Sequence, residues 1–464
     1  MKLSTSGPSR VSRKARRTRR VTSAFAGMLV VALVSAACGG GGDDEGGTGT
    51  DGGGGGGDAT APANLTLWAW TPKAQTEVDL FEKAHPEIKV KLVNAGQGTP
   101  QYTKLRTALK AGSGAPDVVQ IEFQYIPTFS ITEDLVDLNE YGADEIKDQF
   151  PEWVWSLVAP DGDAAYGIPW DTGPLGFMYR EDLLKKAKVE VPTTWDEFRE
   201  AAQKYRAANP DSYLIDLAPT QGGQLLALMA QAGSRPFKVT GGDTVNIKVN
   251  DEGAKKWAAL WTEINNDDSL ARDPDFNDAW YKGLSNGRYA GWLAAAWGPV
   301  FLQGTAANTS GKWRVAELPQ WTEGEHVTAN WGGSTLAVTA QSKFPAQAAE
   351  LAKWLMTDEE SALLFSTKQF LFPSKTSILE NPEYADQEVE FFGGQKVNSL
   401  YAGFSDNIEK DYTWSPFQDY VYQQMNETLG KAIVAKGDLS AALDDLQAKL
   451  VSYGKAQGFN VTEE

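Results

Sequence analysis

Trp170 and Asp171 stand together in a stretch that glycine and proline interrupt on both sides, Ala165-Tyr-Gly-Ile-Pro-Trp-Asp-Thr-Gly-Pro-Leu-Gly-Phe-Met-Tyr179. Proline cannot donate to a β-ladder or continue a helix, so the pattern predicts two short strands joined by a bend. The bend then carries a flat aromatic face beside a strong hydrogen-bond acceptor. These groups suit non-covalent binding by stacking and hydrogen bonding. The same pattern also fits an edge strand with a buried tryptophan.

Other candidate binding residues share this setting, because they lie where a predicted strand ends or beside glycine or proline. Two adjacent glycines, Gly332 and Gly333, would let backbone approach a ligand closely, although they also fit a plain turn. Carboxylates at strand ends are often merely solvated, and tryptophans often pack in a core. The full candidate set is Trp70, Gln97, Glu122, Gln124, Trp170, Asp171, Gln221, Trp297, Trp331, Gly332, Gly333 and Ser334.

Catalytic and metal-binding chemistry finds few parts in this chain. It has only two histidines, His85 and His326, which is too few for a histidine-based zinc site and gives no histidine-dependent triad. The stretch Asp273-Pro-Asp-Phe-Asn277 begins like a calcium loop, but Asp278 replaces the glycine that such a loop requires. We therefore expect no catalytic residue, no metal and no cofactor. A glycosidase needs only two carboxylates, so a secreted carbohydrate-active hydrolase remains the alternative to a protein that only binds its ligand.

The elements that must position these residues alternate in type from Leu65 onward. Strands are expected at 65–70, 88–94 and 117–122, with helices around 78–84 and 102–111 between them. This order is typical of a parallel sheet built from βαβ units, and ligands of such sheets lie beyond the carboxyl ends of the strands. The loops after Trp70, after Asn94 and at Glu122–Gln124 are therefore expected to face a ligand.

Six stretches, in order along the chain, resemble the family-1 extracellular solute-binding proteins, the sugar-capturing receptors of ATP-driven importers to which the maltose-binding protein belongs. They are Phe81-Glu-Lys-Ala-His-Pro-Glu-Ile-Lys-Val90, Ala115-Pro-Asp-Val-Val119, Tyr166-Gly-Ile-Pro through Tyr179-Arg-Glu-Asp-Leu183, Val191-Pro-Thr-Thr-Trp-Asp-Glu-Phe198, Trp331-Gly-Gly-Ser334 and Lys353-Trp-Leu-Met-Thr-Asp-Glu-Glu360. The resemblance runs from about Leu65 to the C-terminus. It implies a sugar-stacking ring near Trp297.

This resemblance implies an α/β, two-lobed periplasmic-binding-protein-like fold of class II, with an interdomain cleft and crossing hinge strands. The expected division is residues 62–170 plus 335–370 for the N-terminal lobe and 171–334 plus 371–464 for the C-terminal lobe. The ligand would be a carbohydrate, and the partner would be the transmembrane permease of an ABC transporter. The protein itself is expected to be a monomer. All sixteen tryptophans follow Cys38, and flat aromatic faces suit the C–H faces of sugar rings, which favours an oligosaccharide.

The first part of the chain looks like an export signal that ends at the only cysteine, Cys38. Leu33-Val-Ser-Ala-Ala-Cys38 resembles the lipobox of bacterial lipoproteins, with Ser35 where leucine is usual; ordinary signal cleavage is the alternative. We expect residues 1–37 to be the signal peptide, 38–61 a Gly-rich flexible tether, and lipidated Cys38 an anchor on the outer face of the cell membrane. The net charge of −18 opposes contact with nucleic acid and anionic lipid, so no nucleic acid is expected and the membrane is met only through the anchor.

Overall fold

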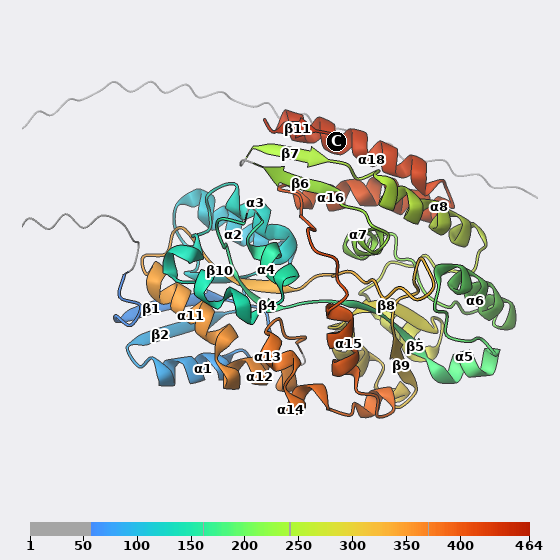
Figure 1. Cartoon of the computed structure of the whole chain (residues 1–464), viewed down its shortest axis with the longest axis horizontal. Helices are drawn as coiled ribbons and strands as arrows, with labels where there is room; N and C mark the ends of the chain where they lie inside the picture. The colour runs from blue at the N-terminus through green and yellow to red at the C-terminus, as the bar shows by residue number, and fades with distance from the viewer. Residues whose placement is uncertain (1–56, 161, 241–242, 370) are drawn as a thin grey trace, which may run out of the picture. The chain divides into compact units, whose positions relative to one another are not determined.

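The computed structural model describes residues 57–160, 162–240, 243–369 and 371–464 (Figure 1). Residues Gly54–Glu464 belong to one compact unit. Its described part is built on three β-sheets, one of five strands and two of three strands. We call the part around the five-stranded sheet the first lobe, and the part around the other two sheets the second lobe.

The five-stranded sheet has the strand order β2-β1-β3-β10-β4. Its first three members run parallel, whereas β10 is antiparallel to both β3 and β4. Alternation sends Val118 into one core and Val119 and Ile121 into the core on the opposite face. The strands are β1 (Ala63–Trp68), β2 (Ile88–Val93), β3 (Val118–Glu122), β10 (Ser334–Val338) and β4 (Ile168–Asp171).

Helices bury their apolar stripes against both faces of this sheet. Phe81 of α1 and Leu351 of α11 share a core with Leu65 and Leu67 of β1, while Leu105 of α2 packs on the other face. The helices of this lobe are α1 (Gln75–Ala84), α2 (Thr99–Ala111), α3 (Ile126–Ser130), α4 (Glu152–Val158), α11 (Pro345–Thr357) and α12 (Glu359–Lys368), with 3₁₀ turns at η1 (Phe123–Tyr125), η2 (Leu138–Tyr141) and η3 (Asp144–Gln149).

The second lobe holds two antiparallel or mixed sheets, with orders β8-β5-β9 and β11-β7-β6. Trp257 and Trp261 of α8 are fully buried in its core. Helices α8, α16 and α18 gather beside β7 and β11 (Figure 1). The strands are β5 (Leu175–Arg180), β6 (Phe237–Thr240), β7 (Thr244–Ile247), β8 (Gly291–Ala295), β9 (Trp313–Ala316) and β11 (Asn460–Thr462).

Among the remaining helices, five begin at an N-cap residue whose side chain accepts a hydrogen bond from the first turn. Thr194 caps α6 in a complete capping box with Glu197. The helices are α5 (Glu181–Ala187), α6 (Trp195–Ala208), α7 (Gly222–Gln231), α8 (Glu252–Asn266), α9 (Asp278–Asn286), α10 (Gly298–Thr305), α13 (Thr376–Leu379), α14 (Pro382–Ala385), α15 (Val397–Ser405), α16 (Gln418–Met425), α17 (Lys431–Ala435) and α18 (Leu439–Ala456), with η4 (Ala307–Thr309), η5 (Glu390–Phe392) and the π-turn η6 (Asn426–Gly430).

Three segments cross between the lobes and hydrogen-bond to one another. Thr172 N donates to Phe372 O at 3.1 Å, and Trp331 N donates to Gly173 O at 2.8 Å. A Cβ on Gly173 would lie 2.1 Å from Trp331 O, so only glycine allows these two chains to approach so closely. Gly333 has a φ of 92°, in the left-handed region that favours glycine. The predicted bend between two strands is therefore confirmed as a hinge crossing, at residues 172–174.

Candidate functional site

A buried polar network lies where the strands of the first lobe reach the hinge. Asp171, at the end of β4, accepts hydrogen bonds from the hydroxyl of Ser334 and from its backbone N–H, the latter at 3.0 Å. Gln120 Nε2 donates to Ser334 Oγ at 3.0 Å. Gln120 Oε1 accepts from the backbone N–H of Trp70 at 3.1 Å, just beyond β1. The network thus fixes the ends of four neighbouring strands relative to one another.

Beside this network, Glu122 and Gln124 follow the carboxyl end of β3. Tyr102 OH donates to Glu122 Oε2 at 2.9 Å, and Gln124 also hydrogen-bonds this carboxylate. The ring of Trp70 packs edge-on against Tyr102, with centroids 6.4 Å apart. Gln124 Oε1 is buried and has no hydrogen-bond partner among the described residues. A buried acceptor without a partner is costly, so Gln124 is poised to receive a hydrogen bond from a ligand.

The second lobe contributes an aromatic group at the hinge. Trp297 Nε1 donates to Trp331 O at 2.9 Å, and the two rings meet edge-on with centroids 4.7 Å apart. The indole of Trp331 lies against the start of α7, where a Cβ on Gly223 would meet Trp331 Nε1 at 2.8 Å and Tyr422 OH at 3.5 Å. Gly223 therefore makes room for two aromatic side chains that converge at this end of the second lobe.

The two lobes meet directly at the edge of this region. Arg106 of α2 forms an ion pair with Asp419 of α16, with Nη2 and Oδ2 2.5 Å apart. Tyr125 of the first lobe also hydrogen-bonds Asp419. Tyr422 lies close enough to Tyr125 and Glu122 for their negative charges to raise the pKa of its hydroxyl. Residues of α2, β3 and η1 thus face residues of α7 and α16, and we call this region the interlobe site.

Burial governs the charges of the interlobe site. It raises the pKa of Asp171 to about 6, although the hydrogen bonds from Ser334 oppose the shift. Burial also raises the pKa of Glu122, while hydrogen bonds from Tyr102 and Gln124 oppose it and the nearby Asp171 adds to it. Two carboxylates in one buried region disfavour the binding of an anionic ligand there, so the site suits a neutral ligand rich in hydroxyl groups.

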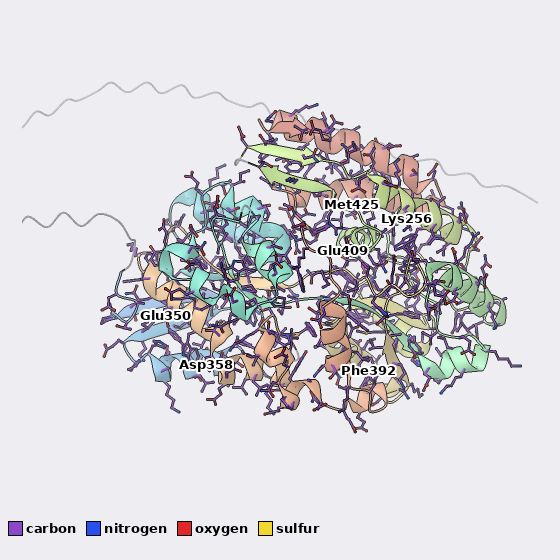
Figure 2. The ribbon with its side chains drawn as sticks, viewed as in Figure 1. Lys256, Glu350, Asp358, Phe392, Glu409 and Met425 are labelled. Carbon is purple, nitrogen blue, oxygen red and sulfur yellow. The ribbon has the colours of Figure 1, made fainter. Side chains whose placement is uncertain are left out.

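A narrow pocket also lies between the lobes, where α4 faces the hinge strand and the segment before α16. Trp153, Asn330, Tyr412 and Trp414 are among the residues that line it, and Glu409, labelled in Figure 2, lies at its edge. It encloses about 30 Å³ of free space, the room of one water molecule. A sugar ring therefore cannot enter this pocket unless the lobes or their side chains move.

The structure places the predicted residues unequally around the interlobe site. Most of them lie in or beside the network and hinge, namely Trp70, Glu122, Gln124, Asp171, Trp331, Gly332, Gly333 and Ser334. Trp297 lies behind Trp331. Gln221 stands directly before α7 without capping it, and its side chain donates to Asp275 at 3.1 Å. Gln97 is exposed in the loop before α2, away from the hydrogen-bond network described above.

Trp170 is the exception that needs correction. Its side chain is 4% exposed in the core of the first lobe and meets Phe365 with ring centroids 4.9 Å apart. Alternation along β4 explains this placement, because Trp170 and Asp171 point to opposite faces of the strand. The alternative interpretation of an edge strand with a buried tryptophan describes Trp170 better than a stacking role, since β4 ends the five-stranded sheet.

The sequence interpretation missed several residues of the interlobe site, among them Tyr125, Asp419 and Tyr422. Tyr125 follows Gln124 directly, so extending the strand-end argument by one residue would have found it. Asp419 and Tyr422 lie near the start of α16, far from every candidate in the sequence. Their helical spacing of three residues puts them on one face, but nothing local shows which face meets the other lobe.

Among the described residues, no group of three or more His, Cys, Asp or Glu side chains is placed to hold a metal ion. No helix in the described part of the chain is long and apolar enough to cross a membrane. Cys38 lies outside the described residues.

Comparisons with known proteins agree with this architecture. Residues 46–362 match the family model described as bacterial extracellular solute-binding protein. An arabinooligosaccharide-binding protein of Halalkalibacterium halodurans is 24% identical over 81% of this chain and 89% of its own length. A solved binding protein of an ABC transporter from B. animalis subsp. lactis, in complex with beta-1,6-galactobiose, is 31% identical, with a TM-score of 0.76 over 86% of this chain and 99% of that one. A galacto-N-biose-/lacto-N-biose I-binding protein from Bifidobacterium longum is 29% identical, with a TM-score of 0.75 over 87% and 99% of the two chains.

Proposed function

This chain belongs to the bacterial extracellular solute-binding protein family, and from that premise we propose that it captures an oligosaccharide between its lobes and delivers it to the permease of an ABC transporter. The observation that carries the proposal is the convergence of Gln124 and Tyr125 from the first lobe with Trp331 and Tyr422 from the second. A site shared by two lobes is complete only when they close.

The chemistry of this region supports a neutral sugar as the ligand. Trp70 and Tyr422 are only partly buried and offer flat faces for the C–H surfaces of sugar rings, and each aromatic contact contributes about 0.5–1.5 kcal/mol beyond area burial. Glu122 and Gln124 offer acceptors for hydroxyl groups, each worth about 1 kcal/mol net. Several such contacts reach the roughly −8 kcal/mol of a micromolar site.

Closure is the mechanism that turns binding into a signal for transport. The three crossing segments at residues 172–174, 329–334 and 372–374 let the lobes rotate while the strand network around Asp171 and Ser334 stays intact. A sugar that contacts both lobes stabilises the closed form by contacts that the open form cannot make. The permease then distinguishes loaded from empty protein by the closed arrangement.

The relatives narrow the class of sugar to test. Their ligands include arabinooligosaccharides and lactose, and the solved structures hold beta-1,6-galactobiose or lacto-N-biose. These are di- or oligosaccharides, in agreement with the abundance of tryptophan in this chain. We propose a ligand of two or three sugar units for the interlobe site.

Titration of intrinsic tryptophan fluorescence tests the proposal. The mature protein, titrated with arabinotriose, lactose, beta-1,6-galactobiose and maltotriose, is expected to show saturable quenching or enhancement with at least one sugar. A ligand at 100 times its Kd should also stabilise the fold by about 2.7 kcal/mol, which a thermal-shift assay detects. The absence of binding to every sugar in a broad oligosaccharide panel would contradict the proposal.

A hydrolase remains the second candidate only because the chain is rich in carboxylates. Its named relatives in the comparisons are binding proteins. Incubation of the bound sugar with the protein, followed by chromatography, separates the two, since a binding protein leaves the sugar intact.

The anchor, the partner and the oligomeric state complete the proposal. We propose that lipidated Cys38 holds a monomer on the outer face of the cell membrane, where the 38–61 tether lets the lobes reach the permease. The proposed lobe boundaries remain residues 62–170 plus 335–370 and 171–334 plus 371–464. Sheet membership supports them, because β10 joins the first sheet while β5, β8 and β9 form a separate one.

A further inference from the structure

A second pocket of the described structure lies outside the interlobe site, among α10, α14, η5 and the start of α15. It encloses about 380 Å³ of free space, which falls within the size range of small-molecule sites. Phe392, labelled in Figure 2 beside α15, follows the pocket residue Phe391 in the chain. The pocket is more than ten times roomier than the narrow pocket between the lobes.

Tyr384 is the residue that makes this pocket more than a surface hollow. Its side chain is 3% exposed, and burial alone raises the pKa of its hydroxyl, with no hydrogen bond contributing. Tyr384 lines the pocket, and its hydroxyl makes no hydrogen bond to the described residues. A ligand oxygen that reaches this hydroxyl can form a hydrogen bond with it, because a phenol can both donate and accept.

The other walls define the chemistry of the ligand. Gln303 of α10 lines the pocket and makes no side-chain hydrogen bond among the described residues, so its amide can both donate and accept. Phe391 and Pro299 supply apolar surface, whereas Glu388 and Glu390 bring negative charge to the exposed side. An anion is disfavoured there, and a neutral ring with hydroxyl groups and C–H faces fits both kinds of wall.

We propose that the pocket lined by Tyr384, Gln303 and Phe391 is a second carbohydrate site in this protein, separate from the interlobe site. This second site rests on the proposed function only for the class of its ligand, a carbohydrate. Because it involves one lobe almost alone, it binds sugar without requiring closure. Such a site would hold a sugar near the protein at high local concentration while the interlobe site is already filled.

Isothermal titration of the mature protein with lactose and beta-1,6-galactobiose tests the inference. Wild-type protein is expected to bind two molecules of at least one sugar, one tightly and one weakly. Tyr384→Phe should weaken the weak phase about three- to tenfold, the effect of one lost hydrogen bond, and leave the tight phase unchanged. Tyr420→Phe, at a partly buried tyrosine of α16 that stacks on Tyr453, serves as the matched control with both phases intact.

Two further variants keep the outcome decisive. Ser310→Trp should fill the pocket and abolish the weak phase, and an unchanged melting temperature would show that the variant folds. Trp331→Phe should weaken only the tight phase. A single binding site in wild-type protein, or a weak phase that ignores both Tyr384→Phe and Ser310→Trp, would overturn the second site. Loss of the tight phase alone would count against the proposed function and leave the second site standing.

Discussion

One carboxylate oxygen of Asp171 accepts hydrogen bonds from both the hydroxyl and the backbone N–H of Ser334, which joins the end of β4 to the start of β10 at the hinge. This contact lies where the first lobe passes into the crossing segments, so it fixes the strand ends from which both chains leave. The charge of Asp171 therefore affects the stability of the fold at the point where the two lobes join.

Asp171 should make stability depend on pH in a defined window. Burial raises its pKa to about 6 from an ordinary value of 3.8, so the folded protein holds a proton that the unfolded chain has lost between these values. Stability from this group is therefore present at low pH and falls as pH rises from about 4 to about 6. Asp171→Asn should remove this decline, by up to about 3 kcal/mol, in urea unfolding at several pH values. Asp196→Asn, at an exposed position of α6, should leave the pH profile as in wild type.

The side chain of Gln124 should increase the affinity for sugar at a small cost in the stability of the free protein. Gln124→Leu removes a buried acceptor that lacks a partner, so the free protein should keep or slightly gain stability despite the lost bond to Glu122. The same change should weaken sugar binding about tenfold, because a ligand hydroxyl loses its acceptor. Calorimetric titration and thermal unfolding measure the two effects. Gln457→Leu at the exposed end of α18 is the control, and equal affinity of both variants would contradict the role of Gln124.

Arg106 and Asp419 should favour the closed form weakly. Both side chains are more than a third exposed, at 37% and 42%, so solvent limits the pair to about 0.2–1 kcal/mol. In a double-mutant cycle with Arg106→Ala and Asp419→Ala, the coupling energy for sugar binding should lie in this range and shrink in high salt. A parallel cycle at Lys449 and Asp445, an ion pair within α18, should give no coupling to sugar binding.

Gly173 should tolerate no side chain. A Cβ there would lie 2.1 Å from Trp331 O, so Gly173→Ala must push the crossing segments apart. We expect a loss of at least about 2 kcal/mol in unfolding free energy, or a weaker sugar affinity if the hinge opens to relieve the contact. Gly304→Ala in α10, where no atom lies within 4 Å of the added Cβ, should instead stabilise the protein by about 0.5–1 kcal/mol. Equal behaviour of the two variants would refute the hinge argument.

Cys38 should decide whether the protein stays on the membrane. With Cys38→Ser, the protein is expected to leave the membrane fraction after export, because the thiol proposed to carry the lipid is absent. Immunoblots of membrane and medium fractions measure the distribution, and sugar affinity should not change. Retention of Cys38→Ser in the membrane would show that another segment anchors the chain.

Much of the first lobe could be predicted from local patterns. Alternation fixed the strands near Leu65, Ile88 and Val118, and the Gly and Pro interruptions around Trp170 marked the hinge crossing. The facing direction of Trp170 was missed because period-two alternation gives opposite sides but not which side is the core. Asp419 and Tyr422 were out of reach, since their contacts with Arg106 and Tyr125 join residues about 300 positions apart. No local pattern carries that pairing.

The position of β10 also bears on how the chain can fold as it is made. This strand fills the gap between β3 and β4, although more than 160 residues separate β4 from β10 in the sequence. Until residue 338 has emerged, the newly made β3 and β4 each lack the neighbour that completes their ladders, and such open edges invite pairing with other chains. Keeping the new chain extended until late in synthesis would prevent such pairing. Passage through a membrane before folding is compatible with this order of events.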